Sequence, residues 1–422
     1  MIRYDQHICA PAVLVLAACS ALAAATATSP AGSKQVAIEQ IPGQADVGFI
    51  EIHGVAAGTF NPAPWRAGTL HWLADVRTPL IRPRFSGVFR NIYAPSVVEV
   101  PGGWRVFYGA WDGVDTGNDR IYSLETADFL DLHGRTTVIE HGCFIHACNV
   151  SAVWFEDGSC HIVCTVYPDQ RKRNKPASFH SPDGVVWNGS PAPYAARMTD
   201  IIEMAGYPPY ADADINGVNV LLCEGGAYRL YFNNWRDAGK VYRASGTDGK
   251  RFRFEGVCLD TAHGVNDVKK FVLAGKTYYL MALHRNTDRL WYCLSSDGMH
   301  FEPERELVRH LDDRDRYIVA VGWVVQGTRL LGFLYGAGAV PTLDRNRIFA
   351  RWLQKKVVFV DDQGKRFEPT RSLGPDRQLL WLGEAGKLDG RFEVFAEDGR
   401  TRLGKPMRAK AVSGAVYKLR MP

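Results

Sequence analysis

The chain has 422 residues, of which 46% are apolar and 23% charged, with 41 glycines and 22 prolines. This balance is typical of a packed globular protein rich in turns and excludes a disordered chain. The formal net charge is only +5, with Lys and Arg scattered among acids, so nucleic acid is not expected as a partner. The densest basic run, residues 171–173, has the polar surroundings of a solvated loop and is given no function.

Residues 1–28 are predicted to be an export segment. Arg3 precedes an apolar run over residues 10–25, which is too short to span a bilayer and resembles a secretory signal peptide. The string LAACS around Cys19 resembles a bacterial lipobox, whose Cys would be lipidated, and cleavage after small residues at 23–27 is the alternative. The protein is therefore expected in the periplasm, outside the cell, or anchored at the cell surface by lipid alone.

The cysteines indicate buried thiols rather than a metal centre. Two of the nine fall in the export segment, which leaves an odd number in an oxidising compartment. Cys160 and Cys164 lie about 13 Å apart if they share a strand, too far for a disulfide, so Cys143 with Cys148 is the better local pair. No CxxC or His spacing fits a zinc site, and no other metal or cofactor motif is present.

Five segments repeat one design after the export segment. Each has an apolar strand, a Gly turn, an aromatic-rich second strand, a polar loop, a third strand and often a fourth. The first two strands of the repeats cover Ala94–Trp111, Asn149–Tyr167, Val218–Trp235, Asn266–Arg285 and Ile318–Gly336. The repeats predict an all-β protein, a five-bladed β-propeller over residues 78–369. Residues 29–77 would lead into it, and residues 370–422 would form a short C-terminal β appendage.

Chain direction sorts the side chains by rim. Because antiparallel strands alternate in direction, the starts of the first strands, the loops between second and third strands, and the connections between blades share one rim. Asp183, Asp248 and Asp297, in turns of the SPDG, GTDG and SSDG type, fall on the other rim. These three are expected to shape tight turns.

The blade pattern, these turns, and the string RNIYAPSVVEV followed by WRVFYGAWDG resemble the five-bladed glycoside hydrolases. That superfamily includes arabinanases, xylosidases, invertases, levansucrases and mannoside phosphorylases, and the resemblance implies a carbohydrate in the central funnel. Its members carry an Asp in blade one, an Asp in blade two and a Glu in blade three. Here Asn91 stands near the first position, His146 and Asn149 near the second, and Asp212 and Asp214 near the third. The usual triad is therefore not intact. Whether a Ca²⁺ ion binds in the channel is left open, because no motif in the sequence supports it.

Glycoside cleavage needs one carboxylic acid to protonate the leaving oxygen and one carboxylate to attack or to activate water. Asp267 is the first candidate, as base or nucleophile, because it opens the innermost strand of blade four; a cap at the strand entry is its structural alternative. Asp214 or Asp212 is the second candidate and Asp112 the third, with Asp214 or Asp112 as the acid. The candidates for substrate binding on the same rim are Asn91, Trp111, His146, Asn149, Asp212, Trp235, His263, His284 and Arg285.

Arginines near this rim allow two interpretations. Arg120, Arg285 and Arg289 would favour the ionised form of a neighbouring carboxylate or bind a uronic or sulfated sugar, and ordinary ion pairing is the simpler account. The sequence as a whole predicts an exported glycoside hydrolase. A non-catalytic carbohydrate-binding propeller is the alternative, because Asn91 replaces an acid and blade three lacks a clear Glu.

Overall fold

The chain folds almost entirely into β-strands over the residues that the computed structural model describes, which are 37–41, 48–84, 91–112, 117–341 and 345–420. This confirms the all-β class. The predicted export segment lies outside the described residues. No described helix has the length and apolar character needed to cross a membrane. The helical elements of the described residues are α1 (Pro62–Ala67) and the 3₁₀ turns η1 (Met198–Asp200), η2 (Pro208–Ala211), η3 (Trp235–Asp237), η4 (Asp313–Asp315) and η5 (Gly383–Ala385).

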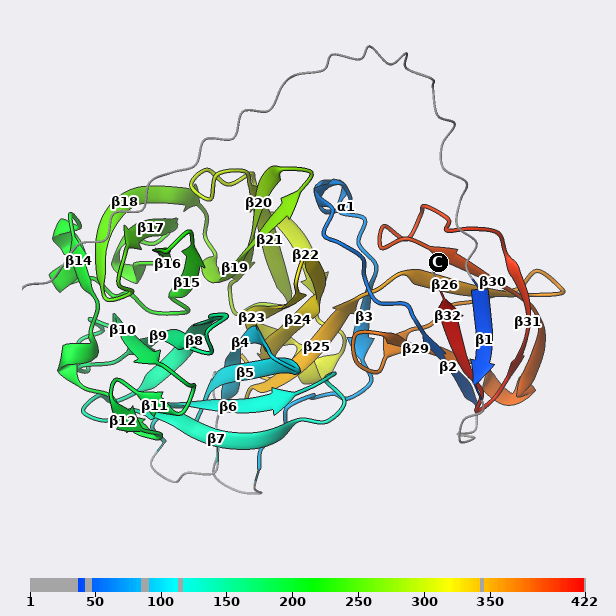
Figure 1. Cartoon of the computed structure of the whole chain (residues 1–422), viewed down its shortest axis with the longest axis horizontal. Helices are drawn as coiled ribbons and strands as arrows, with labels where there is room; N and C mark the ends of the chain where they lie inside the picture. Colours follow the sequence, from blue (N-terminus) through cyan, green and yellow to red (C-terminus); the bar gives the residue numbers. More distant parts are fainter. Residues whose placement is uncertain (1–36, 42–47, 85–90, 113–116, 342–344, 421–422) are drawn as a thin grey trace, which may run out of the picture. The chain divides into compact units, whose positions relative to one another are not determined.

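Each predicted repeat forms an antiparallel sheet of consecutive strands (Figure 1). The first contains β4 (Ile92–Val100), β5 (Gly103–Ala110), β6 (Arg120–Thr126) and β7 (His133–Glu140), with β13 (Tyr194–Ala195) parallel to β7; the second contains β8 (Ala147–Trp154), β9 (Cys160–Val166) and β10 (Lys175–Ser181). The pair β11 (Val186–Trp187) and β12 (Ser190–Pro191) follows the second sheet. The third contains β15 (Val220–Glu224), β16 (Ala227–Phe232), β17 (Lys240–Gly246) and β18 (Arg251–Asp260), with β14 (Glu203–Ala205) parallel to β18. The fourth contains β19 (Gly264–Leu273), β20 (Lys276–His284), β21 (Arg289–Ser295) and β22 (Arg305–Arg309).

The fifth repeat supplies only three of the strands in its sheet. These are β23 (Tyr317–Gln326), β24 (Arg329–Gly338) and β25 (Arg347–Leu353), and the outer neighbour of β25 is β3 (Trp72–Asp75), from near the N-terminus. The same sheet then continues through β28 (Arg371–Ser372), β29 (Arg377–Trp381), β2 (Phe49–His53), β32 (Val416–Arg420) and β1 (Ala37–Ile41). Residues from both ends of the chain thus complete this sheet.

A further sheet uses the remaining C-terminal strands. It orders β27 (Arg366–Phe367), β26 (Lys356–Asp361), β30 (Lys387–Phe395) and β31 (Met407–Val412). Its apolar side chains, such as Phe359 and Phe392, share one buried cluster with Ile50 and Tyr417 of the continued fifth sheet. Strands on both sides of residue 370 therefore belong to one hydrophobic core.

The first strands of the five sheets contact one another in cyclic order. β4 contacts β8, β8 contacts β15, β15 contacts β19, β19 contacts β23, and β23 contacts β4 again. In four of these strands the register shifts near the start, between Tyr93 and Ser96 in β4 and at matching places in β8, β19 and β23. A bulge of this kind re-aims the side chains next to it, so the residues at the start of each first strand depart from simple alternation.

The Asp-Gly turns have the predicted structural role. Asp297 Oδ1 accepts hydrogen bonds from the N–H groups of Met299 and His300, both at 2.8 Å, and Asp183 and Asp248 make the same pair of contacts in their turns. The glycine that follows the Asp has φ of 68° at Gly249, a left-handed conformation that favours glycine. These three carboxylates are therefore engaged in their own turns, as predicted.

The described cysteines are all free thiols. The expected pairing of Cys143 with Cys148 is wrong, because Cys148 is buried in the core while Cys143 is exposed. Burial raises the pKa of Cys160 to about 12, which keeps its thiol protonated and unreactive.

Candidate functional site

A cavity of about 400 Å³ lies where the first strands begin. Its lining comes from the starts of first strands, the loops that follow second strands, and the segment leading into β15. Strand direction had assigned these segments of the chain to one rim. The lining residues are Tyr93, Asn149, Tyr167, Lys172, Asn174, Asp214, Asn216, Gly217, Val218, Trp235, His284, Asn286 and Val319. Four of the predicted site residues, Asn149, Asp214, Trp235 and His284, meet here.

Asp214 is the one carboxylate among the described lining residues. The side-chain amide of Asn174 donates to its Oδ1 at 2.8 Å, and its own backbone N–H donates to Asn234 Oδ1 at 3.1 Å. Burial raises the pKa of Asp214 above the usual 3.8, against the opposing effects of the Asn174 hydrogen bond and of the charges on Arg236 and Lys172. Asp214 is thus a positioned carboxyl group that holds its proton to higher pH than an ordinary aspartate.

Trp235 presents an apolar face in this polar cavity. The residue is 42% exposed, although its backbone N–H donates to Asp214 O at 2.9 Å and its indole Nε1–H donates to Asn216 O at 2.8 Å. Asn234 caps the turn η3 by accepting from the Arg236 N–H. The ring is therefore held in place beside Asp214 while its surface stays accessible, which is the arrangement an amphipathic ligand needs.

Three other polar lining residues form one network of hydrogen bonds. Asn216 Oδ1 accepts from Tyr167 OH at 2.9 Å and from Asn149 Nδ2 at 3.4 Å. Asn149 has φ of 56°, in the irregular segment at the start of β8. Amides and phenols can each donate and accept, so this network suits a ligand with many hydroxyl groups.

His284 stays neutral over the physiological range. Burial lowers the pKa of its imidazole to about 4. Its buried Nδ1 has no hydrogen-bond partner among the described residues. The side chain therefore offers the cavity a neutral ring rather than a charge.

Asp267 lies apart from this cavity. Its Oδ2 accepts from the backbone N–H of Trp323 at 2.8 Å, and its Oδ1 is 3.2 Å from Lys269 Nζ. Its neighbours Val268 and Lys269 line a different hollow of about 670 Å³, at the opposite ends of the first strands. The structure therefore engages Asp267 between the fourth and fifth sheets and does not bring it together with Asp214.

Asp112 is also held in ion pairs away from the cavity. It is fully buried, with Arg84 Nε and Arg135 Nη1 both 3.2 Å from its Oδ2. Two guanidinium groups thus pair with this one carboxylate. This arrangement fixes the end of the first sheet and leaves Asp112 outside the lining.

The other predicted binding residues occupy separate places. His263 Nδ1 is 2.8 Å from Glu304 Oε2 and its ring stacks on Trp291, while Asp212 and Arg285 are exposed. Asn91 and Trp111 are buried at the end of the first sheet, where the Trp111 N–H donates to Asn91 O. None of these residues lines the cavity, although Arg285 lies between two residues that do.

His146 joins a carboxylate that lies close to the cavity wall. Its Nδ1 is 3.1 Å from Asp119 Oδ2, and its ring meets Tyr167 edge-on at 5.1 Å. Asp119 is buried, its Oδ1 has no hydrogen-bond partner among the described residues, and its charge contributes to raising the pKa of Tyr93 and Tyr167. Asp119 is thus the carboxylate next to two lining tyrosines.

Sequence reasoning did not assign a site role to Lys172, Asn174, Asn216 or Asn286. Lys172 and Asn174 belong to the loop that follows β9, and loops after second strands were placed on this rim. The position of this loop in the repeat could have indicated that its residues line a site. Their residue types could not, because a run of basic residues is typical of a solvated surface. Among the lining residues, only Asp214 and Trp235 are of a type that indicated a carbohydrate site from the sequence.

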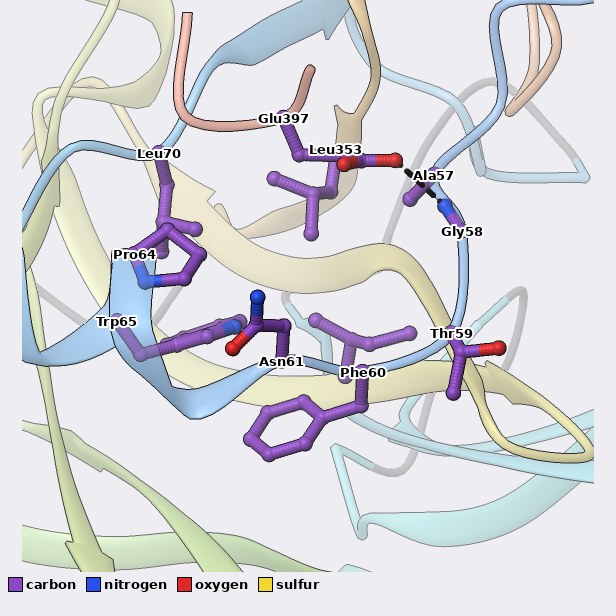
Figure 2. Close-up of a pocket in the computed structure, with 11 residues that line it drawn as sticks. Ala57, Gly58, Thr59, Phe60, Asn61, Pro64, Trp65, Leu70, Leu353 and Glu397 are labelled. Atoms are coloured by element: carbon purple, nitrogen blue, oxygen red, sulfur yellow. Dashed lines mark hydrogen bonds between the residues drawn. The ribbon is translucent and has the colours of Figure 1, made fainter. Parts of the chain in front are cut away.

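A smaller cavity near the C-terminal strands is too small for a ligand of this kind. Figure 2 shows its lining, where Glu397 accepts a hydrogen bond from the Gly58 N–H at 2.6 Å beside Trp65 and Leu353. Its volume is about 20 Å³, which is room for a single water molecule. The contact joins the N-terminal segment to the hairpin after β30.

No protein-family model matches the sequence, and no curated protein matches it either. The folded chain is similar to several solved structures of glycoside hydrolases, the class that its repeats resemble. One is a protein from Bacteroides thetaiotaomicron proposed to be a glycosidase (12% identity, 69% of this chain and 99% of that chain, TM-score 0.49). Two are α-L-arabinofuranosidases: the GH62 catalytic domain from Coprinopsis cinerea (14%, 68% and 97%, 0.47) and the enzyme from Podospora anserina in complex with cellotriose (14%, 67% and 96%, 0.47).

Proposed function

We propose that the chain is a five-bladed β-propeller glycoside hydrolase whose substrate binds in the cavity at the start of the first strands. Support for the propeller comes from the cyclic contacts of β4, β8, β15, β19 and β23. Support for a carbohydrate comes from the exposed Trp235 ring and the Asn149–Asn216–Tyr167 network, which line the same cavity, because sugars combine apolar ring faces with hydroxyl groups.

The observation that carries the proposal is the position of the Asp214 carboxyl group, which lines the cavity and is hydrogen-bonded by Asn174. A glycosidase needs a carboxylic acid that still holds its proton at working pH, and burial raises the pKa of Asp214 in the direction this role requires. Asp214 donates the proton to the leaving oxygen. Asp119, next to the lining residues Tyr93 and Tyr167, is the proposed second carboxylate, which activates water.

A non-catalytic carbohydrate-binding propeller is the second candidate. It is favoured by one observation: the described lining of the cavity contains a single carboxylate, whereas hydrolysis uses two. Asp115 and Asp344, which lie outside the described residues, are further acids of the chain.

Separate measurements of binding and turnover decide between these functions. The purified protein and its Asp214→Asn variant are tested on a panel of oligosaccharides, with binding followed by calorimetry and cleavage by the release of reducing ends. We expect the wild type to bind and cleave, and Asp214→Asn to bind with cleavage reduced by about 100-fold or more. Binding without cleavage by the wild type favours the second candidate, and a protein that neither binds nor cleaves any glycan overturns both.

We also propose that the protein is exported through residues 1–28. The apolar run at 10–25 supports this, and the LAACS string supports a lipid on Cys19. The mass of the N-terminal peptide of the mature protein tests it. A lipidated Cys19 and a start after residues 23–27 are the two expected results, and an uncleaved N-terminus contradicts export.

A further inference from the structure

Three cations at or next to lining residues of the cavity form no ion pair among the described residues. Lys172 lines the cavity itself, Arg236 follows the exposed Trp235, and Arg285 lies between two lining residues. All three side chains are exposed, and none forms an ion pair with a carboxylate of the described residues. Their charges therefore face solvent, and those of Lys172 and Arg236 lie close enough to Asp214 to lower its pKa.

Other arginines predicted on this rim are neutralised by acids. Arg120 pairs with Glu140, and Arg289 Nε is 2.9 Å from Asp288 Oδ1. Ion pairing, the simpler account of the rim arginines, holds for these two. It holds also for Arg173 of the β9–β10 loop, whose Nη2 is 2.5 Å from Asp169 Oδ2. It does not hold for Lys172, Arg236 or Arg285, and the first two of these act on Asp214 in the cavity.

Two contacts hold the basic loop in place. The Arg236 guanidinium donates to Arg171 O at 3.1 Å, which ties η3 to the loop between β9 and β10. Lys175 Nζ donates to Arg173 O at 3.1 Å and to Ala213 O at 2.7 Å, which ties the same loop to the segment that carries Asp214. The loop is thus fixed beside the cavity, and a ligand does not have to order it.

The charges act on the groups inside the cavity. Lys172 and Arg236 both lower the pKa of Asp214, in opposition to the larger effect of its burial. The ammonium group of Lys175 is bonded to carbonyl groups alone, and burial lowers its pKa to about 8, which leaves it charged at neutral pH. Among the described lining residues the only carboxylate is Asp214, while Asp212 and Asp169 act on Lys175 and Arg173 nearby.

We propose that the glycan bound here is anionic and that its carboxylate or sulfate group lies between Lys172 and Arg236. Like charges held near each other repel, and an anion that bridges them removes the repulsion and adds charge-assisted hydrogen bonds. A neutral sugar could accept hydrogen bonds from these cations but would not remove their mutual repulsion. The inference rests on the proposed function and adds the substrate class to it.

Matched pairs of glycans test the inference. Uronate-containing polysaccharides are compared with their carboxyl-reduced forms, and sulfated ones with their desulfated forms, in binding assays at low salt and at about 0.5 M salt. We expect at least one acidic glycan to bind about tenfold or more tightly than its uncharged partner at low salt, with the advantage reduced at high salt. The two series distinguish a carboxylate from a sulfate.

Variants that remove one positive charge test where the anionic group of the glycan binds. Lys172→Gln and Arg236→Gln are expected to weaken binding of the acidic glycan severalfold each and to weaken binding of its uncharged partner less. Lys387→Gln, which removes an exposed charge from β30, is the control and should change neither. Equal binding of both partners, or tighter binding of the uncharged one, overturns the anionic substrate and leaves the proposed function standing. Failure to bind any glycan removes the proposed function itself.

Discussion

The side chain of Asp267 and the backbone of Trp323 join two neighbouring sheets, since Asp267 Oδ2 accepts the Trp323 N–H at 2.8 Å. Ser96 Oγ accepts the Ala152 N–H between the first and second sheets, and Ser151 Oγ accepts the Leu221 N–H between the second and third, both at 3.0 Å. All three acceptors follow a register shift in a first strand. Asp267 thus occupies the place of Ser96 and Ser151 in the repeat.

We expect Asp267→Ala to reduce the free energy of unfolding by about 1–3 kcal/mol, because the buried Trp323 N–H loses its acceptor. Asp267→Asn keeps an acceptor oxygen and should cost less. Denaturant unfolding measures both, with Ser96→Ala as the control for loss of the matching contact. Asp267→Asn should retain glycan binding and cleavage; loss of cleavage with unchanged stability would restore Asp267 as a catalytic residue.

The contact between Asn174 and Asp214 sets the pH dependence of the proposed acid. The amide of Asn174 stabilises the ionised carboxylate, so its removal raises the pKa of Asp214 further. A general acid loses activity as pH rises through its pKa. In Asn174→Ala the alkaline limb of the cleavage profile should therefore move to higher pH. A limb that stays in place, or moves to lower pH, contradicts the role of Asp214 as the proton donor.

The rim could be predicted from sequence, whereas the place of Asp267 could not. Strand direction alone assigned strand starts and second loops to one end, and Asp214, Trp235, Asn149 and His284 meet there. The sequence did not indicate where the Asp267 side chain lies, because the register shifts between Val265 and Asp267 and a shift of one residue turns a side chain to the other face. A bulge of this kind leaves no mark in the pattern of apolar and polar residues.

Lys172 was missed for a different physical reason. A run of basic residues has the same sequence whether it lies in solvent or beside a cavity. The contacts that decide this, from Arg236 to Arg171 O and from Lys175 to Ala213 O, join segments about 40 to 65 residues apart in the chain. Long-range contacts of this type are set by the ring of sheets and not by local sequence.

The exposed ring of Trp235 is expected to supply stacking energy to a bound sugar. Trp235→Ala should weaken glycan binding by about 1 kcal/mol or more, which is about fivefold in Kd. Trp235→Phe keeps a flat face but loses the hydrogen bond to Asn216 O, so its effect should be smaller. Trp381→Ala removes a more exposed Trp, at 63%, from β29 and should leave binding unchanged. Equal effects of Trp235→Ala and Trp381→Ala would contradict a stacking role.

Buried histidines should make the protein sensitive to acid. Burial lowers the pKa of His71, His161 and His284 to about 4, from the ordinary 6.5. Between these two pH values the unfolded chain binds more protons than the folded protein, so stability is lost as pH falls from 6.5 towards 4, by on the order of 3 kcal/mol for each group. Denaturant midpoints measured across this range should fall steadily as pH is lowered.

His161→Gln separates this effect from the titration of carboxylates. Gln can preserve the hydrogen bond that His161 Nε2 shares with Ser178 Oγ, yet it carries no titrating group. The variant should therefore lose less stability than the wild type between pH 6.5 and pH 4. His133→Gln changes an exposed histidine and should follow the wild type. A His161→Gln curve parallel to the wild type would show that protonation of His161 does not drive unfolding, and would assign the acid loss to other groups.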